Sequence, residues 1–150
     1  MRRRQLLATV GTLTAGTVGC VGRPGDLGKT PTSEPPPRIT ETSFTARDGE
    51  CGLDTDVARV TVDGDIVRID GRLLTPTPCH GAVLADATLV SGGDRLVVAV
   101  RTTDSPPDVC VQCVGELPYE ALVRIAGGQP ATVQVDHDGE TVTTVTTVDR

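Results

Sequence analysis

The residues with the most chemistry in this sequence are four cysteines, and one histidine lies beside one of them. They are Cys51, Cys79, Cys110 and Cys113, with His80 directly after Cys79. Cysteine side chains form disulfides, hold metal ions or carry redox chemistry, depending on their surroundings. Cys110 and Cys113 have the Cys-x-x-Cys spacing that is common among zinc ligands. Three kinds of site therefore compete for these residues.

Disulfides are the expectation that the sequence favours. An even number of cysteines in an exported domain indicates a disulfide framework. In an extended strand, residues three apart lie about 10 Å apart, whereas a disulfide needs Cα atoms within about 7 Å. A Cys110–Cys113 bridge is thus disfavoured, and we expect both residues to pair with Cys51 and Cys79, in either combination.

A metal or thiol-redox site using Cys79, His80, Cys110 and Cys113 is the alternative. Adjacent Cys and His rarely converge on one ion, and the sequence has no second Cys-x-x-Cys. Redox Cys-x-x-Cys motifs open a helix, whereas Gly115 follows this motif closely and the flanks indicate strand. We therefore expect no bound metal.

Other catalytic arrangements lack a supporting motif. His80 lies in a Pro-rich turn and His137 in a predicted hairpin turn, so both are expected to be solvated or bonded within their turns. Neither Ser91 nor Ser105 lies in a nucleophile motif. The acidic segment Asp54-Thr55-Asp56 lacks the loop length of a calcium site and is expected to be surface charge. The sequence predicts no enzyme and no cofactor.

The first twenty residues have the order of an export signal, with a cationic start, an apolar stretch and small residues at its end. Arg3 and Arg4 precede one polar residue and two leucines, which resembles a twin-arginine (Tat) signal. The segment ends in Thr17-Val18-Gly19-Cys20, which resembles a lipobox. We expect a signal peptide over residues 1–19 and a lipid on Cys20 that anchors the protein in the membrane.

Two further segments follow Gly19. Residues 20–38 are rich in Pro and Gly, and we expect them to be a disordered linker behind the anchor. Residues 39–150 hold 18 acidic and 8 basic residues, so this domain is strongly acidic. That charge repels nucleic acid. The bias resembles that of proteins from extreme halophiles, and together with the signal it resembles a haloarchaeal Tat-exported lipoprotein.

Residues 39–150 are predicted to form a β-sandwich, since short alternating runs of Val, Ile, Leu and Thr recur between Gly, Pro and Asp. We expect about seven or eight short strands in an antiparallel, immunoglobulin-like, disulfide-stapled β-sandwich. A small closed barrel is the competing architecture. The expected strands are residues 39–46, 57–62, 66–73, 82–90, 95–102, 119–125, 131–136 and 140–148.

A resemblance narrows the cysteine pairing. The segments Pro78-Cys79-His80, Cys110-Val111-Gln112 and Pro118-Tyr119 resemble a group of small secreted bacterial and archaeal β-sandwich domains that is largely uncharacterised. The resemblance covers about residues 73–135 and implies a Cys79–Cys110 disulfide. That leaves Cys51–Cys113 as the second. It implies no reaction.

The sequence thus predicts a lipid-anchored protein on the extracellular face of the cell membrane. Its expected role is a non-catalytic binding or structural surface module whose partner is a cell-surface protein.

Overall fold

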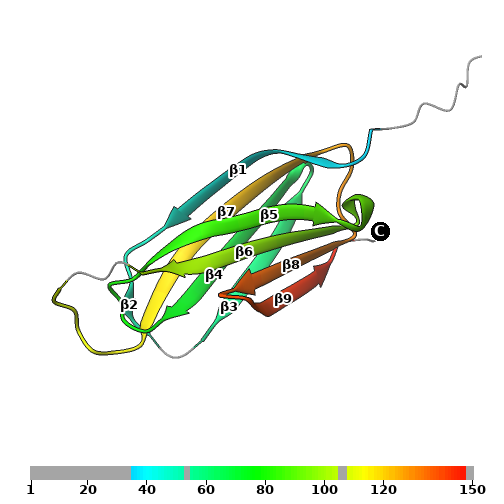
Figure 1. Cartoon of the computed structure of the whole chain (residues 1–150). Coiled ribbons are helices and arrows are strands. Elements are labelled where there is room, and N and C mark those ends of the chain that lie inside the picture. The colour runs from blue at the N-terminus through cyan, green and yellow to red at the C-terminus, as the bar shows by residue number, and fades with distance from the viewer. Residues whose placement is uncertain (1–34, 53–54, 105–107, 148–150) are drawn as a thin grey trace, which may run out of the picture. The chain divides into compact units, whose positions relative to one another are not determined.

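The structure is a computed structural model that describes residues 35–52, 55–104 and 108–147. These residues form two sheets packed face to face, so the predicted disulfide-stapled β-sandwich is confirmed (Figure 1). The predicted signal peptide with Arg3 and Arg4, the predicted lipid site Cys20 and most of the predicted linker fall within residues 1–34, which lie outside the described residues. In the described part of the chain, no helix has the length and apolar character needed to cross a membrane.

The described strands agree with the predicted runs apart from their ends and one short addition. They are β1 (Arg38–Ala46), β2 (Glu50–Cys51), β3 (Val57–Asp63), β4 (Ile66–Thr75), β5 (Gly81–Val90), β6 (Arg95–Thr103), β7 (Gly115–Ala126), β8 (Thr132–His137) and β9 (Glu140–Thr146).

The first sheet has the strand order β1-β7-β4-β3, and β2 pairs with the start of β7. The second has the order β5-β6-β8-β9. All neighbouring strands are antiparallel except β6 and β8, which are parallel. The chain leaves β6, runs back along the first sheet as β7 and returns as β8 in the direction of β6. β6 and β8 therefore pair in the second sheet, although β7, which lies between them in the chain, belongs to the first sheet.

The core lies between the inner faces of the two sheets, because side chains alternate inward and outward along each strand. Along β7, for example, residues 115, 117, 119, 121, 123 and 125 are buried. Small aliphatic side chains fill this core, with Phe44 and Tyr119 as its two aromatic residues and their ring centroids 5.4 Å apart. The buried hydrophobic residues are Val67, Ile69, Leu73, Leu96, Val98, Val100, Leu117, Tyr119, Ala121, Val123, Ile125, Val133 and Val135.

The start of β7 differs from the prediction, which placed it at Tyr119. The strand begins four residues earlier and runs through Pro118, although proline is rare inside a paired strand. β1 ends at Ala46, opposite Tyr119. The missing N–H of Pro118 therefore falls where the pairing with β1 stops, and its carbonyl accepts a 2.8 Å hydrogen bond from the Arg47 N–H.

The packed domain also begins earlier than the predicted boundary at Ile39. Pro37 lies against Gly93, where a Cβ atom would come within 2.8 Å of the proline ring. The Pro35 and Pro36 carbonyl oxygens would each lie 3.0 Å from a Cβ atom at Gly127. The last residues of the predicted linker are therefore part of the sandwich, since they cover two turns at one end of it.

Candidate functional site

Two disulfides join distant parts of the chain at one end of the sandwich. Cys51 pairs with Cys113 and Cys79 with Cys110, with Cα–Cα separations of 5.7 and 6.1 Å. These are the pairs that the resemblance implied. Because Cys110 and Cys113 lie three residues apart between β6 and β7, both disulfides hold the same connection.

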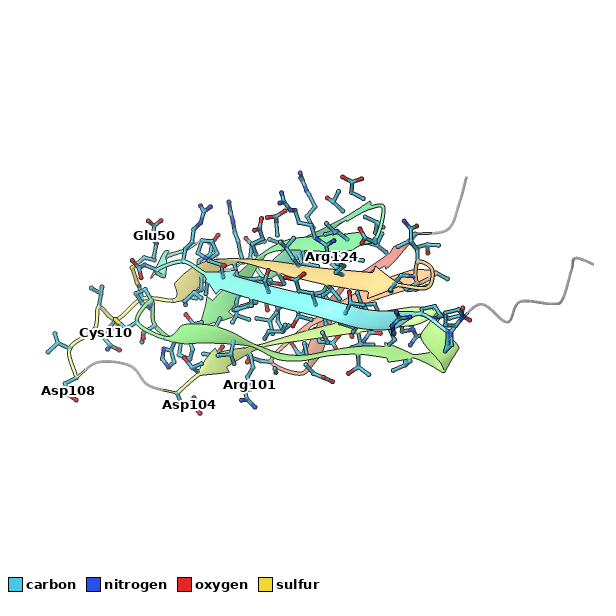
Figure 2. All side chains as sticks on the ribbon, turned by 90° about the horizontal axis from the view of Figure 1, so that it is seen from above. Glu50, Arg101, Asp104, Asp108, Cys110 and Arg124 are labelled. Atoms are coloured by element: carbon cyan, nitrogen blue, oxygen red, sulfur yellow. A yellow bond between two sulfur atoms is a disulfide. The ribbon has the colours of Figure 1, made fainter. Side chains whose placement is uncertain are left out.

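We call residues 108–114 the pinned loop. A hydrogen bond from the Cys113 N–H to the Val111 carbonyl, 3.1 Å long, forms a tight turn inside it. The Gly52 N–H donates to the Val114 carbonyl at 3.1 Å and ties the loop to β2. Figure 2 shows Asp108 and Cys110 at the tip of the domain, on the same end as Glu50.

Apolar side chains in the pinned loop face solvent. Val109 is 88% exposed and Val111 67% exposed, the two largest exposures among the big hydrophobic residues of the described chain. Isolated exposed valines are common, but these two flank Cys110 and are held in place by covalent bonds. The structure thus displays a small, fixed apolar surface at the tip of the domain.

The alternative prediction, a metal or thiol-redox site, requires cysteine thiols that are not in disulfides. In the structure all four cysteines are in disulfides. The His80 ring nitrogen Nδ1 lies 3.0 Å from the Thr77 hydroxyl and 3.2 Å from its carbonyl, so this histidine is bonded within its turn, as predicted. Among the described residues, no three His, Cys, Asp or Glu side chains are grouped so that they could hold a metal ion.

The prediction for His137 is wrong. It is the last residue of β8 and is 1% exposed, not solvated in a turn. The Tyr119 hydroxyl lies 2.6 Å from its Nε2, and an Asp56 carboxylate oxygen lies 2.6 Å from its Nδ1. The expectation that Asp56 is merely surface charge is wrong for the same reason. The signal for His137 was present, because Val133 and Val135 are buried and an alternating strand turns residue 137 inward as well.

These three residues form a linear chain of hydrogen bonds between the two sheets, in which Tyr119 and His137 are buried and Asp56 is partly exposed. The Leu74 N–H donates to the same Asp56 oxygen at 3.2 Å. The simplest assignment has the Tyr119 hydroxyl donating to Nε2 and the Nδ1–H donating to Asp56, which leaves no member unpaired. Burial, and secondly the negative charge of Asp56, raise the pKa of Tyr119 above its ordinary value. Tyr119 therefore keeps its proton and remains a donor.

A hydroxyl, an imidazole and a carboxylate in this order also occur in catalytic triads. Here, however, the burial of the imidazole and the position of the serines indicate a structural role. The His137 side chain is fully buried, and Asp56 is the partly exposed member at 31%. Ser91 precedes β6, whereas His137 pairs with Val100 near the other end of that strand. Ser91 and His137 are therefore too far apart to form a triad, and Ser105 lies outside the described residues.

The turn that directly follows His137 holds it in place. Asp138 and Gly139 have positive φ angles of 48° and 91°, the pattern of a tight two-residue hairpin turn. The Asp138 carboxylate accepts hydrogen bonds from the Thr102 N–H at 2.8 Å and from its hydroxyl at 2.7 Å. This turn, which was predicted, thereby ties the end of β8 to β6 and holds the imidazole in position.

No protein-family model, no curated protein and no solved structure matches the chain. The resemblance to small secreted β-sandwich domains therefore stays a prediction, and the fold and its sites rest on the chain itself.

Proposed function

We propose that this chain is a non-catalytic binding module, held at the outer face of the cell membrane by a lipid on Cys20, that contacts a cell-surface protein through the pinned loop. The two disulfides support an oxidising environment, because cytosolic thiols are kept reduced. The sequence of residues 1–20 supports export and the lipid.

The exposed valines of the pinned loop carry the proposal. Burying a valine side chain against a partner contributes about 1.5 kcal/mol or more. Ordering a free loop would offset such a gain, at roughly 0.5–1.5 kcal/mol for each immobilised side chain. Both disulfides already restrict this loop before it meets a partner. A small apolar surface of this kind is therefore suited to contact.

A photo-crosslinking amino acid placed at residue 109, in the full chain in its own membranes, tests the contact. We expect one discrete protein adduct, strongly reduced by Val111→Ser. The matched control carries the crosslinker at Val83, which is 37% exposed on β5. Equal adducts at both positions, or none at residue 109, would overturn the proposed contact.

The same preparation tests the anchor. We expect Cys20→Ala to move the protein from the membrane fraction to the medium and to remove a lipid mass from the N-terminal peptide. Retention of the Cys20→Ala variant in the membrane fraction would show that the lipid does not hold this protein.

A further inference from the structure

The outward face of the first sheet carries most of the positive charge of an acidic domain. Of the eight arginines among the described residues, six lie on this face or at its edge, and Figure 2 shows Arg124 and Arg101 on opposite faces of the sandwich. The six are Arg38, Arg47, Arg59, Arg68, Arg72 and Arg124. The same face also carries Glu41, Asp70, Glu116 and Glu120, so only the arginines without an acidic partner can attract a negative group.

A groove of about 780 Å³ crosses this face at right angles to the strands. The strand register explains it, because two rows of outward side chains stand on either side of a floor made by Ala58, Gly71 and Tyr119. One row is Val57, Arg72, Pro118 and Arg47, and the other is Arg59, Asp70, Glu120 and Thr45. We call this the transverse groove.

Gly71 makes room for the Tyr119 ring on the inner side of this floor. A Cβ atom at this position would lie 2.2 Å from the Tyr119 ring. The ring therefore lies beneath the glycine on the inner side, and Tyr119 is only 4% exposed. The transverse groove thus offers no aromatic surface for stacking a sugar ring, which argues against a polysaccharide as its occupant.

Each end of the groove has an arginine with no ion-pair partner among residues 35–52, 55–104 and 108–147. Arg72 pairs with Glu116 at 2.9 Å and Glu120 pairs with Arg68 at 3.5 Å, so these charges are matched. Among the described residues, the Arg47 and Arg59 side chains make no ion pair, and neither does Asp70, which lies directly opposite Arg59 in the register of β3 and β4. Arginine binds carboxylates through two parallel hydrogen bonds, so the groove presents two free carboxylate-binding groups.

The separation between Arg47 and Arg59 indicates which spacing of carboxylates a bound peptide needs. Arg47 lies beside β7 beyond the end of β1, and Arg59 lies on β3, so three strand spacings, about 14 Å, separate them across the sheet. They also lie in opposite rows, two residues apart along the strands, an offset that their long side chains can bridge. An extended peptide rises about 3.3 Å per residue, and residues i and i+4 point to the same side. Carboxylates four residues apart match the two arginines, while Asp70 disfavours a third acid between them.

We propose that the transverse groove binds an extended acidic segment of a partner protein, with carboxylates at positions i and i+4 and an uncharged centre. This inference rests on the proposed role as a binding module and names a second contact surface with a defined chemistry. The pinned loop and the transverse groove are separate, so each can be tested without the other.

The direct test measures binding of a fluorescent, end-blocked peptide, Glu-Ser-Thr-Ser-Glu, to the full chain in detergent by fluorescence anisotropy. We expect a dissociation constant of about 1 mM or tighter at low salt. The double variant Arg47→Gln, Arg59→Gln should weaken binding about tenfold. The matched control is Arg95→Gln, Arg101→Gln, which removes the same charge from β6.

Three results would overturn the inference. They are equal loss in both double variants, equal binding of Gln-Ser-Thr-Ser-Gln, and binding of a polyuronate at the two arginines without binding of the peptide. A full effect with the Glu peptide that disappears when its two acids are adjacent would support the spacing. Crosslinking at residue 109 reports the proposed function separately, because it does not involve either arginine.

Discussion

At the scale of single residues, the arrangement with the largest consequences is the buried chain from Tyr119 through His137 to Asp56. It joins β7 of one sheet to β8 of the other and reaches Asp56 just before β3. No buried side-chain polar atom in the described residues lacks a hydrogen-bond partner. Buried polar groups stabilise a fold only when every member is paired, so removal of one member leaves the others uncompensated.

We expect the protein to lose stability above pH 10 through this tyrosine. In the unfolded chain Tyr119 loses its proton near pH 10, whereas burial raises the pKa of Tyr119 in the folded state. Above pH 10 the unfolded state therefore binds fewer protons, and the free energy of unfolding falls by about 1.4 kcal/mol per pH unit. Below pH 10 this contribution is fully present. Urea unfolding at a series of pH values measures it.

Few other side chains of this protein titrate near pH 10, so the effect of Tyr119 can be measured directly. The chain has one tyrosine, and its one lysine, Lys29, precedes the sandwich. Tyr119→Phe should remove the alkaline slope, and at neutral pH it should cost about 1–3 kcal/mol because Nε2 of His137 loses its donor. An alkaline slope that persists in Tyr119→Phe would contradict the assignment, as would tyrosinate absorbance that rises before unfolding.

The sequence could predict part of this residue-level picture. Alternation along Val133, Val135 and His137 points the imidazole inward, but the acidic neighbours Asp136 and Asp138 suggested a solvated turn. Asp56 had no comparable signal. Its role depends on Tyr119 and His137, which are far away in the chain and meet it only after the two sheets pack.

At the scale of elements, the two disulfides fix the loop between β6 and β7 to two other parts of the chain. The Cys51–Cys113 bridge spans 62 residues and the Cys79–Cys110 bridge spans 31. In the chain-entropy model, closing loops of these sizes stabilises by about 4 kcal/mol each. The shorter loop lies inside the longer one, so the two contributions are not additive.

We expect Cys51→Ala, Cys113→Ala to lower the free energy of unfolding slightly more than Cys79→Ala, Cys110→Ala. The reason is that the longer loop restricts more of the unfolded chain. Each double variant should lose roughly 3–4 kcal/mol in urea denaturation, with free-thiol titration confirming that the remaining bridge is intact. A loss below about 1 kcal/mol in either variant would contradict this account of the bridges.

Strands and turns were the elements that sequence could predict, because periodicity and turn residues are local signals. The hairpin turn at Asp138-Gly139 is an example. The parallel pairing of β6 with β8 could not be predicted in this way, since it depends on β7 crossing to the other sheet. β2 was also missed, because a two-residue strand has no period.

At the scale of the whole molecule, charge is the dominant feature. Residues 39–150 hold 18 acidic and 8 basic residues, so the folded domain concentrates negative charge that an unfolded chain spreads out. Salt screens this repulsion, because the screening length falls from about 10 Å at 0.1 M to about 3 Å at 1 M. The folded state therefore gains more from salt than the unfolded state.

We expect the urea midpoint of unfolding to rise steadily as sodium chloride is raised towards molar concentrations. The variant Asp104→Asn, Asp108→Asn removes two exposed acids, one before the pinned loop and one at its first position (Figure 2), and should flatten this dependence. A midpoint that stays constant or falls with added salt would show that self-repulsion does not limit the stability of this domain.

The transverse groove belongs to the same scale and could not be predicted from the sequence. Arg47 and Arg59 are twelve positions apart in the chain, and nothing local relates them. They become the two ends of one groove only through the order β1-β7-β4-β3 and its register.

The nested bridges also decide how the chain responds to mechanical force. When the protein is pulled by its two ends, only the segments outside the loop closed by the Cys51–Cys113 disulfide can lengthen. The segment between Cys51 and Cys113, with a sequence separation of 62 and about 210 Å of contour at full extension, is not stretched by the pull. Stretching would thus peel away β1, β8 and β9 and draw out β7, while β3 to β6 could lose their pairing but not be drawn out.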